Sequence, residues 1–223
     1  MTGMKTALAV ICVMIVGCML WAEVPGLPDI SLPAPRMEGG RPLMQALKDR
    51  QSSRAFGPQK LPAQVMADLL WAAAGINRPD SGKRTAPSAR NWQEIDIYAV
   101  MEEGAYLYDA RANSLRAVAK GDLRQLTGSQ DFVASAPLNL VYVADTTRMK
   151  GSPTGDDLAL YLGADTGFIS QNVYLFCASE GLATVVRASV DRKALAEALK
   201  LPPEKRITLA QTVGYPDTSG RAP

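Results

Sequence analysis

Hydrophobic positions change their spacing along the chain, and the change predicts where helices give way to strands. Residues 61–79 place Val65, Leu69 and Ala73 on one face at helical spacing, which predicts a helix. Residues 95–120 instead carry β-branched and aromatic residues in short runs separated by turn residues. This second pattern predicts a strand followed by a hairpin.

The second half of the chain contains a predicted buried strand and the longest helical pattern. Residues 136–145, "APLNLVYVAD", are almost continuously apolar, which is typical of a central strand. Residues 156–182 are apolar on most sides, so we expect this helix to be buried between layers or in a subunit interface. Four further elements are predicted: a helix at 42–50, an extended segment at 183–190, a helix at 191–201 and a strand at 207–215. Long helices mixed with hairpin-linked strands, without strict βαβ alternation, indicate an α+β fold.

The N-terminus has the pattern of an export signal. Residues 1–22 carry a single charge before an uninterrupted apolar run. Cleavage after Ala22, lipidation of Cys18 in "IVGC" and retention as an uncleaved anchor all fit this segment. We therefore expect a periplasmic protein or one anchored on the outer side of the membrane. Residues 23–40, rich in Pro and Gly, predict an extended tether, and a single domain is expected over 41–223.

The composition removes several classes of chemistry. A chain of 223 residues with 47% hydrophobic residues fits one globular domain. Its net charge is only +2 and its Lys and Arg are scattered, so nucleic acid is not an expected partner. The absence of histidine excludes Ser-His-Asp triads, HExxH zinc sites and 2-His-1-carboxylate iron sites. Cys177, alone beyond residue 22, lies in an apolar helical context and is expected to be buried rather than reactive. No metal site is predicted.

The first candidate for chemistry is "DRQSSRAF", residues 49–56. It places Arg50, Ser52 and Arg54 at alternate positions, so in an extended segment their side chains project to one side. Two guanidinium groups and a hydroxyl are suited to a phosphate or another anionic group. A solvated helix end with incidental arginines explains the octapeptide alone as well.

Two further polar segments are candidates for ligand contacts. Residues 84–94, "RTAPSARNWQE", offer short hydroxyls and a proline-fixed turn suited to a polar heterocycle or sugar, and an ordinary loop has the same composition. Residues 181–191, "GLATVVRASVD", would aim backbone groups at a flat ligand, and a buried strand with one arginine is equally natural. No Rossmann or P-loop motif is present, so a nucleotide would need a different cradle.

Taken in order, these segments resemble the nitroreductase family of FMN-dependent oxidoreductases. "LKDRQSSRAF" resembles the family's N-terminal FMN segment, and "APSARNWQEIDIYAV" is similar to its "PSxxNxQPW" loop leading into a strand. "GADTGFISQNVYLFCASEGLATVVRASVD" resembles its long helix and the following flavin-facing segment. The resemblance implies a three-layer fold with a mainly antiparallel central sheet flanked by helices. It also implies a homodimer with the long central helix at its interface.

The resemblance implies roles for individual residues. Arg50 and Ser52 would bind the FMN phosphate with Gln51 beside them, and Arg54 would face the pyrimidine edge of the ring. A fixed cation there favours the anionic reduced ring. Two more groups complete the implied FMN site: Pro87, Ser88, Ala89 and Asn91 in a loop reaching the FMN of the other subunit, and Val186, Arg187, Ala188 and Ser189 in a segment whose backbone lies against the ring near N5.

The implied activity is a ping-pong oxidoreductase. A donor, expected to be NAD(P)H, passes hydride to flavin N5, and a small oxidised acceptor such as a nitro compound or quinone follows. No side-chain acid or base is required, so no catalytic residue is assigned. Two alternatives remain: a flavin-binding envelope protein without turnover, and a dehydrogenase acting on a modified peptide or metabolite. The azoline-forming branch typically has Tyr-Pro where this chain has Trp92–Gln93, which ranks the second alternative lower.

The sequence also departs from the family's larger members. Ser189 stands where they have a glycine, and only Arg221 follows "VGYP" where they place a basic pair for the phosphate. Arg221 is thus the one basic residue after this strand that could supply such a phosphate contact.

Overall fold

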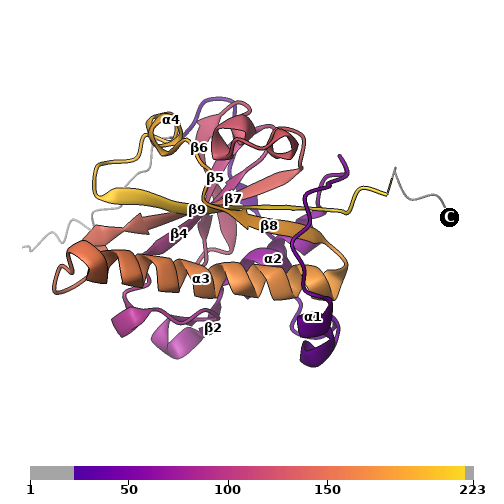
Figure 1. Cartoon of the computed structure of the whole chain (residues 1–223), viewed down its shortest axis with the longest axis horizontal. Coiled ribbons are helices and arrows are strands. Elements are labelled where there is room, and N and C mark those ends of the chain that lie inside the picture. The colour runs from indigo at the N-terminus through magenta and orange to yellow at the C-terminus, as the bar shows by residue number, and fades with distance from the viewer. Residues whose placement is uncertain (1–22, 219–223) are drawn as a thin grey trace, which may run out of the picture.

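The protein is built in three layers, with a sheet between helices (Figure 1). The computed structural model describes residues 23–218, so the predicted export signal and Arg221 lie outside the described residues. Helices α1 to α3 cover one face of the sheet and α4 covers the other. The helices are α1 (Leu43–Asp49), α2 (Ala63–Ala74), α3 (Gly155–Glu180) and α4 (Arg192–Ala198). Within residues 23–218, no helix is long and apolar enough to cross a membrane.

Seven strands form the central sheet, and every neighbouring pair is antiparallel. In spatial order they are β1 (Ile30–Ser31), β6 (Ser114–Lys120), β5 (Gly104–Asp109), β4 (Ile95–Val100), β7 (Leu138–Asp145), β9 (Lys205–Gly214) and β8 (Ala183–Arg187). The α+β fold, the strand-plus-hairpin β4–β6 and the strands β7, β8 and β9 are thus as predicted. The sequence did not predict β1 or the small pair β2 (Ile76–Arg78) and β3 (Lys83–Arg84).

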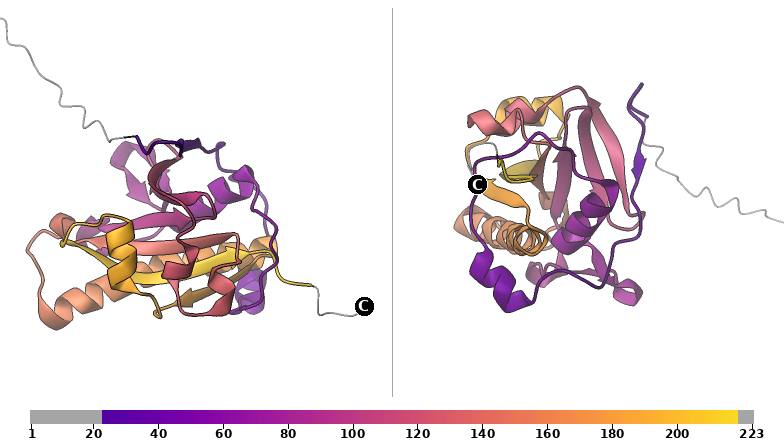
Figure 2. Two further views of the ribbon diagram at one scale, coloured as in Figure 1. Left: turned by 90° about the horizontal axis from the view of Figure 1, so that it is seen from above. Right: turned by 90° about the vertical axis from the view of Figure 1, so that its right-hand side faces the viewer.

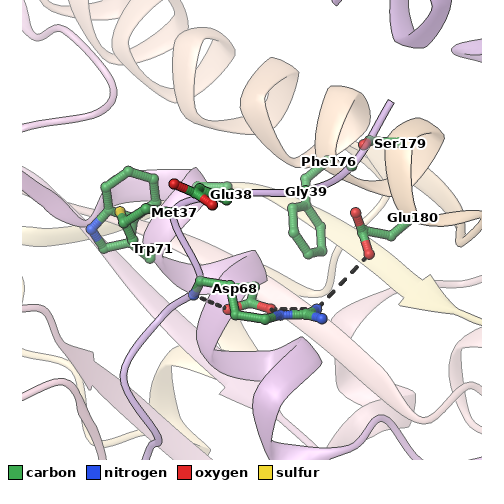
Figure 3. A pocket seen from close by; sticks show the side chains of 11 residues that line it. Met37, Glu38, Gly39, Asp68, Trp71, Phe176, Ser179 and Glu180 are labelled. Carbon is green, nitrogen blue, oxygen red and sulfur yellow. Dashed lines mark hydrogen bonds and ion pairs between the residues drawn. The ribbon is translucent and has the colours of Figure 1, made fainter. Parts of the chain in front are cut away.

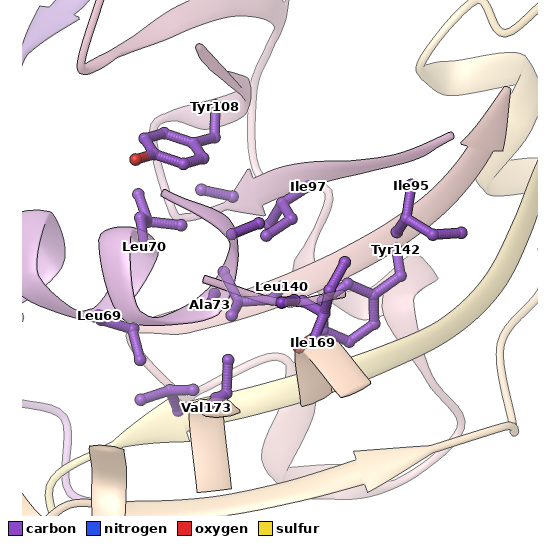
Figure 4. Close-up of a cluster of buried hydrophobic side chains, with 14 of the residues drawn as sticks. Leu69, Leu70, Ala73, Ile95, Ile97, Tyr108, Leu140, Tyr142, Ile169 and Val173 are labelled. Atoms are coloured by element: carbon purple, nitrogen blue, oxygen red, sulfur yellow. The ribbon is translucent and has the colours of Figure 1, made fainter. Parts of the chain in front are cut away.

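Strand β7 lies inside the sheet, between β4 and β9, and is buried along its whole length. Its side chains alternate between the two faces, as strand geometry requires. Leu140 and Tyr142 join the core under α2 and α3, while Val141 and Val143 join the core under α4. Figure 4 shows the larger core, where α2 and α3 side chains meet those of β4 and β7. Burial of β7 on both faces explains its nearly continuous apolar sequence.

Helix ends follow local capping chemistry, with one correction. Gly181 ends α3 in the left-handed conformation at φ 71°, which glycine adopts without steric cost. Asp191 caps α4 as predicted, because its carboxylate accepts a hydrogen bond from the Ala194 N–H. The prediction that Asp156 or Asp157 caps α3 was wrong: the cap is Thr154, and both aspartates lie in the first turn, where the helix dipole favours negative charge.

Helices α1 and α3 leave large apolar side chains uncovered. Phe168 on α3 is 46% exposed and Leu160 is 66% exposed. On α1, only Ala46 is buried, and Leu43, Met44 and Leu47 are exposed. Uncovered apolar groups on a long central helix are typical of an interaction surface.

The Pro/Gly-rich segment 23–40 is mostly irregular but lies against the domain. Leu27 is buried in the larger core, and Ile30 pairs with Leu115 across β1 and β6. The right-hand view of Figure 2 shows this segment along the outer edge of the sheet. Asn113 holds it further on, because its side-chain amide donates to the Pro33 carbonyl at 2.8 Å.

Residues 36–40 then cross between α2 and α3 and enclose a cavity of about 170 Å³ (Figure 3). The Arg36 backbone N–H and Nε each donate to the Asp68 carboxylate at 2.8 Å. Asp68 is 95% buried, with 5% of its surface exposed. The Arg41 N–H donates to the Ser179 hydroxyl at 2.7 Å. These contacts fasten the N-terminal segment to both helices.

We expect Arg36→Ala to lower the free energy of unfolding by about 2–3 kcal/mol, because it leaves a buried carboxylate with Gln64 as its remaining side-chain donor. Urea denaturation measures this change. Lys60→Ala is the matched control, since it breaks a solvent-exposed pair with Glu103 and should cost less than about 1 kcal/mol. Equal losses in the two variants would contradict the assigned role of Arg36.

Candidate functional site

Residues 50–57 pass the open edge of β8 at Ser53 and reach the end of β9 at Gly57. The Ser53 N–H donates to the Thr184 carbonyl at 2.9 Å, and the Gly57 N–H donates to the Tyr215 carbonyl at 2.9 Å. Strand β8 pairs only with β9, so this segment covers the edge that would otherwise be bare. The two predicted FMN segments, 50–54 and 186–189, are therefore neighbours.

Tyr174 of α3 joins these two segments. Its hydroxyl lies 2.9 Å from the Ser52 hydroxyl and accepts a hydrogen bond from the Val186 N–H at 2.9 Å. The Arg50 guanidinium carbon lies 5.3 Å from the centre of the Tyr174 ring, within cation–π range. The structure thus brings Arg50, Ser52 and Val186 to one point, through a tyrosine that sequence reasoning missed.

A cavity of about 180 Å³ opens beside this point. Its lining residues are Arg54, Gln130, Phe132, Val185, Val186, Arg187, Ala188 and Ser189. Arg54 is exposed, so its charge is free to meet a ligand. No carboxylate is among these described lining residues, so the electrostatic balance of the cavity is positive.

Arg187 is buried, with 6% of its surface exposed. Its guanidinium donates to the Thr127 carbonyl at 2.6 Å, to Asn139 Oδ1 at 2.9 Å and to Thr212 Oγ1 at 2.8 Å. Burial lowers the pKa of Arg187 to about 10, so the group stays charged at neutral pH. All three partners are neutral, so the site holds a buried positive charge that forms no salt bridge with the described residues.

The loop at residues 87–93 is strained. Arg90, Asn91 and Gln93 have φ values of 49°, 55° and 51°, in the left-handed region that non-glycine residues rarely adopt. The Ala89 N–H donates to the buried Asp165 carboxylate at 2.8 Å, and the Ser88 hydroxyl accepts from the Gln93 N–H at 3.0 Å. Strain of this kind persists where the surroundings hold it and clusters at functional sites.

This loop and the 50–54 segment meet different parts of α3. The loop is fixed at Asp165, whereas Arg50 and Ser52 meet Tyr174, nine residues further along the helix. At a rise of 1.5 Å per residue, that separation is about 13 Å. Within a single chain, Arg50, Ser52 and Arg54 therefore lie near the 186–189 segment. The other four predicted residues lie away from it: Pro87, Ser88, Ala89 and Asn91.

Glu94, directly after the loop, is a fully buried carboxyl group with 0% of its surface exposed. Neither of its oxygens accepts a hydrogen bond from the described residues. Burial and the neighbouring Asp165 carboxyl raise the pKa of Glu94 to about 7. A buried carboxyl group with a pKa raised toward neutral pH therefore lies beneath the strained loop.

Three residues of the site were not found from the sequence: Tyr174, Gln130 and Phe132. Tyr174 lies inside a helical pattern where an aromatic residue normally indicates core. Gln130 and Phe132 belong to "GSQDF", which begins a 3₁₀ turn (η4, Asp131–Val133) and carries no recognisable motif. The one sequence feature that could have indicated Gln130 and Phe132 was the polar stretch before strand β7.

Fold and site together define an antiparallel sheet with a positively charged cavity beside its outer strand β8. The family model described as "Nitroreductase family" matches residues 47–215. The chain therefore belongs to the nitroreductase family, and it is an oxidoreductase of that family. Members of this family typically bind a flavin.

Relatives agree with this assignment. The chain is 30% identical over 172 residues to the Methanocaldococcus jannaschii protein named "Putative nitroreductase", covering 71% of this chain and 84% of that protein. A crystal structure named "putative nitroreductase", from Ralstonia eutropha, has a TM-score of 0.81 and 41% identity, with 88% of this chain and 93% of that chain covered. The Vibrio harveyi NADPH:FMN oxidoreductase complexed with NAD+ shares the fold, with a TM-score of 0.59, 21% identity and coverage of 81% and 71%.

Proposed function

We propose that this protein binds FMN at the β8 edge and passes hydride from a nicotinamide donor to a small oxidised acceptor such as a nitro compound or quinone. The observation that carries the proposal is the cavity itself. It is lined by Arg54 and Arg187 without a carboxylate, and Arg50 and Ser52 lie next to it. The resemblance of the fold to the Vibrio harveyi NADPH:FMN oxidoreductase supports this choice of cofactor and donor.

The donor set fits FMN. A phosphate requires charge-assisted donors, which Arg50 provides beside the Ser52 hydroxyl. The ring requires a flat, partly apolar slot with positive charge near its pyrimidine edge. Phe132 and Val185 give the cavity apolar walls, and Arg54 supplies an exposed charge. When bound, FMN would supply the hydride-carrying ring, and these residues would hold and orient it.

We also propose a homodimer that completes two sites. If two copies of α3 pack antiparallel, residue 165 of one helix faces residue 174 of the other when the axis crosses between residues 169 and 170. The exposed Phe168 lies next to that axis. Such packing would carry the strained loop fixed at Asp165 to the Arg50 and Ser52 end of the partner's site. A symmetric interface of this kind also covers the apolar groups that α3 leaves exposed.

We also propose that the protein is exported. The apolar run at residues 1–22 would direct the protein to the periplasm or hold it on the outer side of the membrane. Fractionation of cells that produce the full chain tests this part, because recovery in the cytoplasm would contradict it.

An absorbance spectrum of the protein as purified tests the function directly. We expect a flavin spectrum, release of FMN identified by mass, bleaching by NADH or NADPH and reoxidation by a nitroaromatic compound or a quinone. A flavin that no nicotinamide reduces would favour a binding protein without turnover. A colourless dimer that takes up no FMN would refute the proposal.

Replacing Arg50 and Arg54 in turn should distinguish the residue that binds the phosphate from the residue that faces the ring. Arg50→Ala is expected to weaken FMN binding about 10- to 100-fold, because a charge-assisted hydrogen bond contributes about 1.5–3 kcal/mol. Arg54→Ala should instead reduce the preference for reduced over oxidised FMN. Isothermal titration and redox titration measure the two effects, with Lys48→Ala on α1 as the control. Unchanged affinity and potential in both variants would show that this segment does not hold FMN.

A further inference from the structure

A cavity of about 610 Å³ lies between residues 26–30, residues 58–66 and the β5–β6 hairpin. Sites for small molecules have volumes of about 300–1,000 Å³, mostly apolar linings and a few polar groups that orient the ligand. This cavity has that composition, and its apolar lining includes Leu27, Ile30, Leu61, Met66 and Met101. It shares no lining residue with the cavity beside β8, so it is separate from the proposed FMN site.

The N-terminal segment is a packed wall of this cavity. A Cβ added at Gly104 of β5 would lie 2.7 Å from Leu27 Cδ2, so glycine at this position leaves room for the buried Leu27 side chain. A Cβ added at Gly26 would lie 2.7 Å from Lys120 Nζ, which places the Lys120 ammonium group against the same segment. The cavity therefore depends on close contacts between residues 26–27 and the hairpin.

Tyr106 of β5 brings an unpaired hydroxyl group to the cavity. Only 3% of the Tyr106 surface is exposed, and its hydroxyl forms no hydrogen bond with residues 23–218. The hydroxyl oxygen retains accessible surface and Tyr106 lines the cavity, so this oxygen faces the cavity. A buried tyrosine hydroxyl usually has a hydrogen-bond partner. A ligand that carries an acceptor group would provide one.

Lys120, at the end of β6, brings an uncompensated charge to the same cavity. The other two cations in the lining are paired: Lys60 with the two glutamates of the β4–β5 turn, and Arg124 with Asp122 at 2.6 Å. Lys120 forms no ion pair with the described residues. An unpaired ammonium group beside an apolar cavity favours a ligand with a negative charge.

The register of the hairpin places Lys120 and Tyr106 on one face. Lys120 lies opposite Gly104, and Gly104 and Tyr106 are two positions apart on β5. Alternate residues of a strand project to the same side, as do residues directly opposite each other on paired strands. The cavity therefore combines apolar walls with two hydrogen-bond donors on one side.

We propose that this cavity binds a fatty acid. Its acyl chain lies along the apolar walls, and its carboxylate accepts hydrogen bonds from the Lys120 ammonium group and the Tyr106 hydroxyl. Charge-assisted hydrogen bonds of this kind are about twice as strong as those between neutral groups. Burial of the acyl chain supplies the rest of the affinity, in proportion to the apolar area removed from water.

The position of the cavity in the chain suits a ligand from the membrane. Leu27 follows the apolar run at residues 1–22 by five residues, which span about 17 Å when extended. A chain held at the membrane by that run, as proposed above, would keep the cavity close to acyl chains. The binding itself does not depend on this attachment.

Decanoate and decyltrimethylammonium test the proposal, because they share one chain and carry opposite charges. Isothermal titration below their critical micelle concentrations should show that the purified protein binds decanoate at least about tenfold more tightly. From hexanoate to decanoate, the affinity should rise about three- to fourfold for each added methylene group, as expected for a chain that becomes buried.

Two variants assign the binding to this cavity. Lys120→Met keeps an apolar stem without the charge, so the preference for decanoate should fall below about threefold. Tyr106→Phe removes only the hydroxyl group and should weaken decanoate binding about five- to tenfold, with decyltrimethylammonium unaffected. Lys193→Met, at an exposed position of α4 on the other face of the sheet, is the matched control and should bind as the wild-type protein does.

Three results would overturn the proposal. They are a wild-type protein that binds no decanoate, equal affinity for the two head groups, and decanoate binding that neither Lys120→Met nor Tyr106→Phe changes. None of these results depends on whether FMN binds, so the fatty-acid site and the proposed function are tested independently.

Discussion

Glu94→Gln is expected to stabilise the protein by about 3 kcal/mol at pH 8 and to leave its stability at pH 4.5 almost unchanged. The folded state raises the pKa of Glu94 from its ordinary value of 4.5 to about 7. As pH rises from about 4.5 to about 7, the unfolded chain loses this proton while the folded chain keeps it. Stability therefore falls across that window, by about 1.36 kcal/mol for each unit of pKa difference, and levels off above it.

Urea denaturation of both proteins between pH 4.5 and pH 8.5 measures this effect. Glutamine carries no charge and offers an N–H to the Asp165 carboxylate, so the variant should lose the pH dependence that Glu94 causes. Glu197→Gln on the exposed side of α4 is the matched control and should follow the wild-type curve. A wild-type stability that rises with pH across the window, or equal destabilisation of Glu94→Gln at every pH, would contradict the assignment.

Phe168→Glu is expected to dissociate the proposed homodimer and to release FMN in the same step. Two copies of Phe168 would lie beside the two-fold axis, so the change places two like charges opposite each other in an apolar interface. Such a juxtaposition costs several kcal/mol, which raises the dimer dissociation constant by at least about 100-fold. Sedimentation equilibrium measures dissociation, and flavin absorbance in the same cell measures cofactor release.

The matched control is Gln125→Glu, which adds the same charge at an exposed glutamine outside α3, on the 3₁₀ turn η3 (Arg124–Thr127). It should weaken the dimer less, because no apolar side chain is lost. A Phe168→Glu protein that stays dimeric and keeps its FMN would exclude α3 as the interface.

Most of the fold was predictable because the elements that build it have strong local signals. The helical pattern of α3 extends over 26 residues, and β7 is a long apolar run. Both patterns are longer than those that occur in loops. Strand β1 has only two residues, and its pairing with Leu115 depends on contacts 85 positions apart in sequence, Ile30 to Leu115. Short elements of this kind are fixed by tertiary contacts, which no local pattern records.

The site was predictable only where a motif marked it. Arg50, Ser52 and Arg54 stand out through their spacing, and the structure places them near the 186–189 segment as the resemblance implied. Tyr174 was missed because one of its sides belongs to the core and its role is visible only in the hydroxyl. Arg187 was predicted for its backbone, whereas the burial of its guanidinium among neutral hydrogen-bond partners is a property of the folded chain alone.

The two outer strands of the sheet have a consequence for association. An open strand edge invites another chain to add a strand, and proteins prevent this by shortening or covering the edge. Here β1 pairs with Ser114 and Leu115 of β6, the Ala117 N–H of β6 donates to Asp29, and β8 is covered by the segment around Ser53. Neither border offers a continuous row of free backbone groups, so the sheet is protected against edge-to-edge aggregation while the apolar side chains of α3 stay available for association between helices.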